Sequence, residues 1–163
     1  MKLDFLHTVP YVCVRWAEVA RQTPDAPFLT EETSGISYSR RQADDLSARV
    51  YGYLKRKGIG AESFVLIRLP RDARPFIAML GVWKAGAAFT VVENTYAPER
   101  IEAIERDCHC RLVIDEDAWG EILTTEPLPG FRQADDHDAC FAIAFLGRGS
   151  GGNRSLGAEA PGK

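Results

Sequence analysis

Apolar residues recur along this chain with two different spacings, and segments of the two kinds alternate. Between residues 39 and 57 the apolar positions fall three to four apart, which is typical of a helix that buries one face. Residues 64–69 are instead apolar at consecutive positions, broken only by Arg68. Such a run is typical of a strand in a parallel sheet that helices cover on both faces. The hydrophobic pattern therefore predicts an α/β fold.

The order of the elements narrows the fold class further. We expect helices over residues 12–21, 39–57, 71–84, 98–107 and 117–123, a hairpin of strands 28–30 and 36–38, and further strands over 64–69, 87–92, 112–114 and 140–146. From residue 39 onward helices and strands alternate, and this alternation predicts mostly parallel strands joined by helical connections. Residues 124–138 contain prolines and an acidic cluster and are expected to form a connecting loop.

Several boundaries carry their own chemical signals. Ser39 is a residue type that caps helices, and Gly58 suits the left-handed position just after a helix end. Pro75 is compatible with the first turn of the helix predicted over 71–84. Lys84 and Gly86 are interpreted as structural, because they end that helix and allow a tight turn into the next strand.

Large side chains on the apolar helix faces are assigned to the core. On the helix predicted over 71–84 the inward residues are Phe76, Ile77, Leu80 and Trp83. Trp16 has the same position on the first helix. We therefore expect all five side chains to be buried.

Composition and charge exclude several classes of function. The 163 residues are 45% hydrophobic and 26% charged, as in an ordinary globular protein, and the net charge is −3 with scattered basic residues, which argues against nucleic-acid binding. We expect no membrane span, because no apolar run approaches the roughly 18 residues that one needs. Residues 1–10 lack the apolar core of a secretory signal, so a cytoplasmic protein with four reduced cysteines is expected.

The strand predicted over 140–146 leads directly into a glycine-rich segment, 147–153. Glycine backbones allow positive φ and close approach, and exposed N–H groups of such loops bind phosphates. The candidates for phosphate contact are Ser150 and the amides of Gly151 and Gly152. The dinucleotide-binding motif is excluded because neither a helix nor the required acidic residue follows, and the P-loop motif fails at residues 153–154.

A cluster of cysteine and histidine is the other candidate for chemistry. Cys108, His109 and Cys110 precede a predicted strand, and His137 and Cys140 follow later. Their spacing is not that of a usual zinc site, so packing is the favoured interpretation and no metal site is predicted. We also assign no catalytic residue within the chain.

Several short motifs together resemble one enzyme family. Residues 83–89 read WKAGAAF, residues 96–101 read YAPERI and residues 111–115 read RLVID; upstream, residues 22–27 read QTPDAP and residues 36–39 read ISYS. In this order and spacing they resemble the N-terminal part of the AMP-forming adenylate-ligase superfamily, above all an amino-acid adenylation domain of a non-ribosomal peptide synthetase. The chain departs from the family pattern at residues 91–94, and at residues 154–155, where the family has proline and lysine in its glycine loop.

The resemblance implies a fold and a function. It implies a truncated N-terminal subdomain of an adenylate-forming enzyme, with residues 1–146 as a partial adenylation domain and residues 147–163 as a degraded glycine-rich loop and flexible tail. In the family this loop holds the phosphates of ATP, whose cofactor ion is Mg²⁺. ATP reacts with a carboxylic acid to give acyl-AMP and pyrophosphate, and the acyl group then passes to a phosphopantetheine carrier thiol. The loop residues implied here are Gly149, Ser150, Gly151 and Gly152.

Because the family's specificity and catalytic regions lie beyond this loop, the chain is expected to be inactive alone. Two alternatives remain open at this point. One is a non-catalytic interaction module or half of a split adenylation enzyme, partnered by a complementary C-terminal fragment or a carrier protein. The other is a stand-alone nucleotide-binding domain.

Overall fold

The fold comes from a computed structural model, which describes residues 12–132 of the chain. The helices are α1 Val12–Gln22, α2 Arg40–Arg56, α3 Arg74–Lys84, α4 Pro98–Asp107 and α5 Glu116–Leu123, and the strands are β1 Pro27–Thr30, β2 Ser37–Ser39, β3 Phe64–Ile67, β4 Ala88–Val91 and β5 Leu112–Ile114. Each element predicted between residues 12 and 123 is present, with ends that differ by a few residues. The strand predicted over 140–146 lies outside the described residues.

The central sheet is parallel, as the alternation of helices and strands predicts. Its order is β4-β3-β5, and β3 pairs in parallel with both neighbours. The predicted hairpin is also confirmed, because β1 and β2 pair antiparallel in a separate two-stranded sheet. The fold class is therefore α/β with mostly parallel strands.

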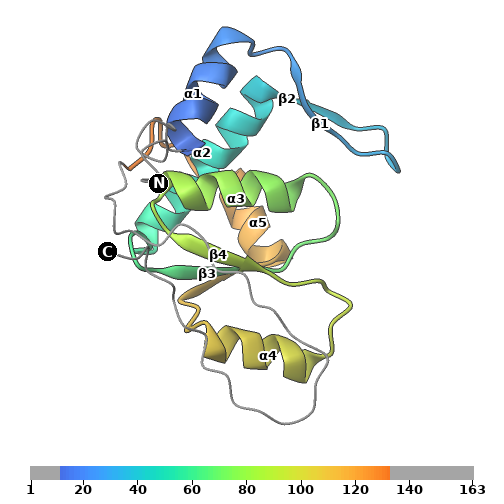
Figure 1. The fold of residues 1–163 in the computed structure, drawn as a ribbon, viewed down its shortest axis with the longest axis vertical. Coiled ribbons are helices and arrows are strands. Elements are labelled where there is room, and N and C mark those ends of the chain that lie inside the picture. The colour runs from blue at the N-terminus through green and yellow to red at the C-terminus, as the bar shows by residue number, and fades with distance from the viewer. Residues whose placement is uncertain (1–11, 133–163) are drawn as a thin grey trace, which may run out of the picture.

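Helices cover both faces of the central sheet. In β3, Val65 and Ile67 belong to the larger core that α2, α3 and α5 share, whereas Leu66 belongs to a smaller core with Ile101 and Ile104 of α4. Figure 1 shows α4 on one side of the sheet, with α3 and α5 on the other. A strand buried from both sides cannot alternate apolar and polar residues, which explains the continuous apolar run of β3. No helix among the described residues is long and apolar enough to cross a membrane.

The start of α2 follows the predicted capping chemistry. The Ser39 hydroxyl accepts a hydrogen bond from the Gln42 backbone N–H at 3.2 Å, and the Gln42 side chain accepts one from the Ser39 N–H at 2.8 Å. This reciprocal pair satisfies two N–H groups that a helix start otherwise leaves without partners. At the other end Gly58 has a φ of 70°, in the left-handed region expected of it.

We expect Ser39→Ala to lower the free energy of unfolding by about 1 kcal/mol, because the cap is lost and the Gln42 backbone N–H loses its acceptor. Urea unfolding of the purified chain measures this loss. Gln42→Ala is the matched control, since it keeps the Ser39 hydroxyl and should cost less. Equal stability of Ser39→Ala and the unaltered chain would contradict a capping role.

The predictions for α3 were partly wrong. The helix begins at Arg74 instead of residue 71, because the Ala73 N–H donates to Glu31 Oε1 and the Arg74 N–H donates to Asp72 Oδ1, which sets the start of the helix there. Ile77 and Leu80 are buried as expected, but Phe76 is 49% exposed. One residue turns a helix by about 100°, so Phe76 points away from the face that Ile77 buries.

The two tryptophans assigned to the core are only partly buried. Trp16 packs edge-on against Phe28 with ring centres 5.0 Å apart, and Trp83 packs in the same manner against Phe89 at 5.3 Å. Both rings therefore lie at the periphery of the core and not at its centre.

Candidate functional site

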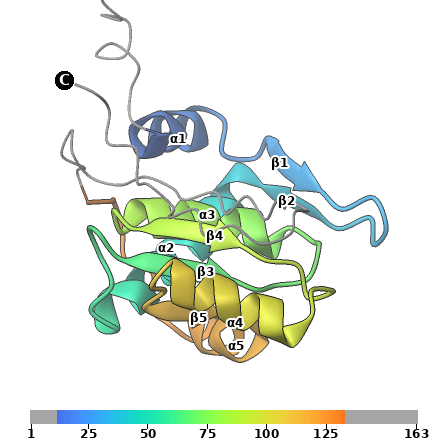
Figure 2. The same cartoon turned by 60° about the horizontal axis from the view of Figure 1, so that its bottom comes forward.

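Polar side chains follow the carboxyl ends of all three strands of the parallel sheet. Arg68 comes directly after β3, Asn94 comes shortly after β4, and Asp115 comes directly after β5. Because β3, β4 and β5, labelled in Figure 2, run parallel, their carboxyl ends lie at one edge of the sheet, and these three residues follow those ends. Open α/β sheets bind ligands at this edge, so it is the first place to look for a site.

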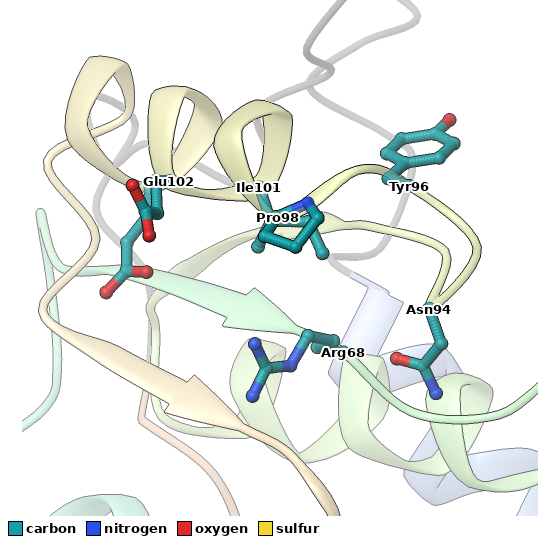
Figure 3. Close-up of a pocket in the computed structure, with 7 residues that line it drawn as sticks. Arg68, Asn94, Tyr96, Pro98, Ile101 and Glu102 are labelled. Atoms are coloured by element: carbon teal, nitrogen blue, oxygen red, sulfur yellow. The ribbon is translucent and has the colours of Figure 1, made fainter.

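A pocket of about 500 Å³ lies at this edge, between the end of β3 and helix α4. It is lined by Arg68, Asn94, Tyr96, Pro98, Ile101, Glu102 and Glu105. Figure 3 shows Arg68 on the strand side of the pocket, with Pro98, Ile101 and Glu102 of α4 opposite it. The lining therefore combines one cation, two carboxylates and a small apolar surface.

An ion pair holds the guanidinium at the pocket floor. Arg68 Nη2 lies 3.2 Å from Asp115 Oδ2, and the backbone N–H of Arg68 donates to the Ile114 carbonyl at 2.9 Å. The other carboxylate oxygen of Asp115 accepts from the Ala118 N–H at 3.1 Å and so caps α5. Asp115 is therefore a positioning group that orients Arg68, with both of its oxygens already engaged.

An aromatic ring stands on the opposite rim. The guanidinium carbon of Arg100 lies 4.2 Å from the ring centre of Tyr96, which is a cation–π arrangement. This contact joins the loop before α4 to the first turn of the helix. The cation–π contact therefore holds the Tyr96 ring against α4.

The arrangement suits contact with a polar partner better than bond-breaking chemistry. Arg68 and the two glutamates of α4 can bind groups of opposite charge. Among residues 12–132, no three His, Cys, Asp or Glu side chains are grouped so that they could hold a metal ion. Cys108 and His109 therefore do not form such a group with other described residues, and Cys108 packs in the smaller core as expected.

The phosphate-binding residues predicted from the sequence, Gly149, Ser150, Gly151 and Gly152, lie outside the described residues. The same holds for His137 and Cys140, and for the proposed division of the chain at residues 146 and 147. Their assignments stay predictions.

The pocket residues themselves were missed by the sequence analysis. Arg68 was noted only as an interruption of an apolar run, and Asn94 only as a departure from a family pattern. A polar residue directly after a buried strand was the available signal, because such a residue reaches the edge of the sheet where ligands bind.

Comparison with known proteins gives the family. Residues 16–147 match the family described as AMP-binding enzyme. Surfactin synthase subunit 1 of Bacillus subtilis is 33% identical over 99 residues, which are 61% of this chain and 3% of that protein. D-lysergyl-peptide-synthetase subunit 2 of Claviceps purpurea is 36% identical over 97 residues, which are 60% of this chain and 7% of that protein.

Solved structures show the same fold. The N-terminal subdomain of Klebsiella oxytoca NpsA superposes with a TM-score of 0.73 at 19% identity, covering 88% of this chain and 39% of that one. A fatty acyl CoA synthetase of Mycobacterium tuberculosis superposes with a TM-score of 0.70 at 16% identity, covering 82% of this chain and 32% of that one. The chain thus spans a small part of the relatives it matches. It belongs to the AMP-binding enzyme family, and its fold is that of part of the N-terminal subdomain of NpsA.

Proposed function

We propose that this chain is the N-terminal supporting part of an ATP-dependent, AMP-forming ligase. The enzyme would activate an amino acid or other carboxylic acid as acyl-AMP, with release of pyrophosphate, and pass the acyl group to a phosphopantetheine thiol on a carrier protein. The family match over residues 16–147 carries this proposal. The peptide synthetases among its relatives favour an amino acid as the acid.

The described residues would serve as the scaffold beside the ATP site. The carboxyl ends of β4, β3 and β5 lie side by side at one edge of the sheet, and the pocket beside Arg68 lies at that edge. The loop residues Gly149, Ser150, Gly151 and Gly152 would bind the ATP phosphates through N–H groups and a hydroxyl, and bound Mg²⁺ would neutralise phosphate charge. Among residues 12–132, no three His, Cys, Asp or Glu side chains are grouped so that they could hold this ion.

We further propose that the 163-residue chain has no adenylation activity by itself. It covers 39% of the NpsA N-terminal subdomain, and catalysis by differential binding requires groups on all sides of the reacting atoms. A site that contacts ATP from one side only would not orient the acid for attack.

Amino-acid-dependent exchange of pyrophosphate into ATP tests this proposal. We expect the purified chain to give no exchange above a blank without amino acid, whereas a complete adenylation domain run in parallel gives a strong signal. Exchange that depends on a particular amino acid and on the chain would contradict the proposal. Millimolar ATP is used in both reactions so that weak binding alone does not hide activity.

One observation favours the alternative of a split enzyme or interaction module. Large apolar side chains are exposed at several places, among them Ile36 before β2 at 50%, Phe76 in α3 at 49% and Val91 in β4 at 41%. A complementary polypeptide that covers them would gain hydrophobic contact area. Co-expression with the remaining part of an adenylation domain tests this reading: recovered exchange activity and co-purification support a split enzyme, and separate elution with no activity contradicts it.

A further inference from the structure

Helix α4 ends in a tightly wound turn. The N–H of Cys108 donates to the Ile104 carbonyl at 2.9 Å, that of His109 to Arg106 at 3.1 Å, and that of Cys110 to Glu105 at 3.0 Å. His109 has a φ of 49°. The His109–Arg106 and Cys110–Glu105 hydrogen bonds, together with the left-handed conformation of His109, define a Schellman motif. Glycine is the usual residue at the left-handed position of this motif.

This turn brings two thiols together. With His109 in the left-handed conformation the chain reverses, and Cys108 and Cys110, on either side of this residue, both pack against the smaller core. Cys108 is buried against the smaller core, whereas Cys110 is only half-buried. Cys110 also lines a surface depression of about 440 Å³, together with Glu102, Glu105, Arg106 and His109. A small reagent can therefore reach the Cys110 thiol, whereas the Cys108 thiol is covered by the smaller core.

We propose that Cys108 and Cys110 form a reversible dithiol–disulfide site that reacts with small-molecule disulfides such as oxidised glutathione. The Cys110 thiolate attacks one sulfur of the reagent, the reagent's S–S bond breaks, and one glutathione leaves and takes up a proton. The Cys108 thiolate then attacks Cys110 sulfur and displaces the second glutathione. Two protein thiols are oxidised to one disulfide and one glutathione disulfide is reduced to two thiols, so atoms and electrons balance.

The surroundings of the pair make this reaction slow at neutral pH. Burial raises the pKa of Cys110 to about 12, with the neighbouring Cys108 and Glu105 adding to the effect, and burial also raises the pKa of Cys108, with Asp107 adding. The remaining charged or titratable groups at the depression are Glu102, Arg106 and His109. Because the thiolate is the attacking species, the rate should rise about tenfold per pH unit between pH 7 and 9. The raised pKa values slow the exchange without opposing the disulfide at equilibrium.

Mass spectrometry of the full chain gives a direct test. The chain is equilibrated in glutathione redox buffer, acid-quenched, alkylated and cleaved with trypsin after Arg106 and Arg111, which releases residues 107–111 with Cys108 and Cys110 as the only cysteines. We expect this peptide to escape alkylation and to weigh less by two hydrogen atoms, and dithiothreitol to reverse both changes. A stable glutathione adduct on Cys110, or two alkylated thiols at every buffer ratio, would overturn the proposal.

Two comparisons test whether the fold promotes the Cys108–Cys110 disulfide or whether it forms only because the two residues are close in sequence. Cys110→Ser should abolish the change in Cys108, whereas Cys13→Ser should leave the disulfide intact. At one fixed glutathione ratio, the disulfide should be at least threefold more populated in the folded chain than in urea, since the turn holds the thiols together. Equal populations in the two states would contradict a site that the fold creates.

Discussion

Gly81→Ala is expected to lower the free energy of unfolding by about 3 kcal/mol, the upper part of the usual range for overpacking. Gly81 lies in α3 where this helix crosses α2. A Cβ at Gly81 would lie 2.3 Å from Val50 Cβ and 2.9 Å from the Ser47 carbonyl oxygen. The second neighbour is backbone, which a side-chain rotation cannot move away. The helices must therefore separate, and the contacts between their buried faces weaken.

Gly120→Ala is the matched control for this prediction. Gly120 also lies inside a helix, α5, but a Cβ there would meet nothing within 4 Å. Alanine should stabilise that position by up to about 1 kcal/mol through its higher helix propensity. Urea unfolding compares the two variants. A Gly81→Ala variant as stable as the unaltered chain would show that α2 and α3 are not packed this closely.

Asp44→Ala is expected to cost about 3 kcal/mol, the lower end of the range for breaking a buried ion pair. The Lys84 side chain is 5% exposed, and its Nζ donates to Asp44 Oδ1 at 2.8 Å and to the Asp44 carbonyl at 3.2 Å. Trp16 Nε1 donates to the same carboxylate oxygen at 2.8 Å. Removal of the carboxylate leaves a buried ammonium without its counter-charge and an indole N–H without its acceptor. The Asp44 side chain is 45% exposed, so water offsets part of this cost.

Lys84→Met should cost much less than Asp44→Ala. Methionine keeps an unbranched apolar stem in the buried position, and the Asp44 carboxylate stays partly hydrated and still accepts from Trp16. In the double variant, most of the Asp44→Ala loss should disappear, because the unpaired charge has been removed. Thermal or urea unfolding of all four proteins gives the coupling between the two residues. Equal losses for the two single variants would contradict a buried ammonium that depends on Asp44.

The alternation of helices and strands was predictable because it rests on local physics. Spacing of apolar residues, the capping chemistry of Ser39 and the left-handed preference of Gly58 all act within a few residues of the chain. The inward face of α3 was less predictable. Residues 75–83 are almost entirely apolar, so their pattern does not say which side faces the core, and Phe76 was assigned to the wrong one.

Of the two candidate sites, one could be predicted from the local sequence and the other depends on the tertiary structure. A glycine-rich segment can be recognised from its sequence alone, because backbone conformation and bare N–H groups make its chemistry; the role of Gly149, Ser150, Gly151 and Gly152 remains a prediction. The pocket beside Arg68 depends on strand order, which brings Arg68 at the end of β3 together with Asn94 after β4 and with side chains of α4. No local pattern specifies that order.

The sequence by itself determined the α/β class, the parallel sheet and the family, since these follow from periodicity and from motifs in a set order. Only the tertiary structure decided that Lys84 is buried against Asp44, 40 positions away, and that Gly81 is where α2 and α3 touch. It also decided that a left-handed turn at His109 lies between Cys108 and Cys110, which both pack against the smaller core. The physical reason is that helix packing and chain reversal bring these residues together. The residue types alone do not specify which residues become neighbours in this way.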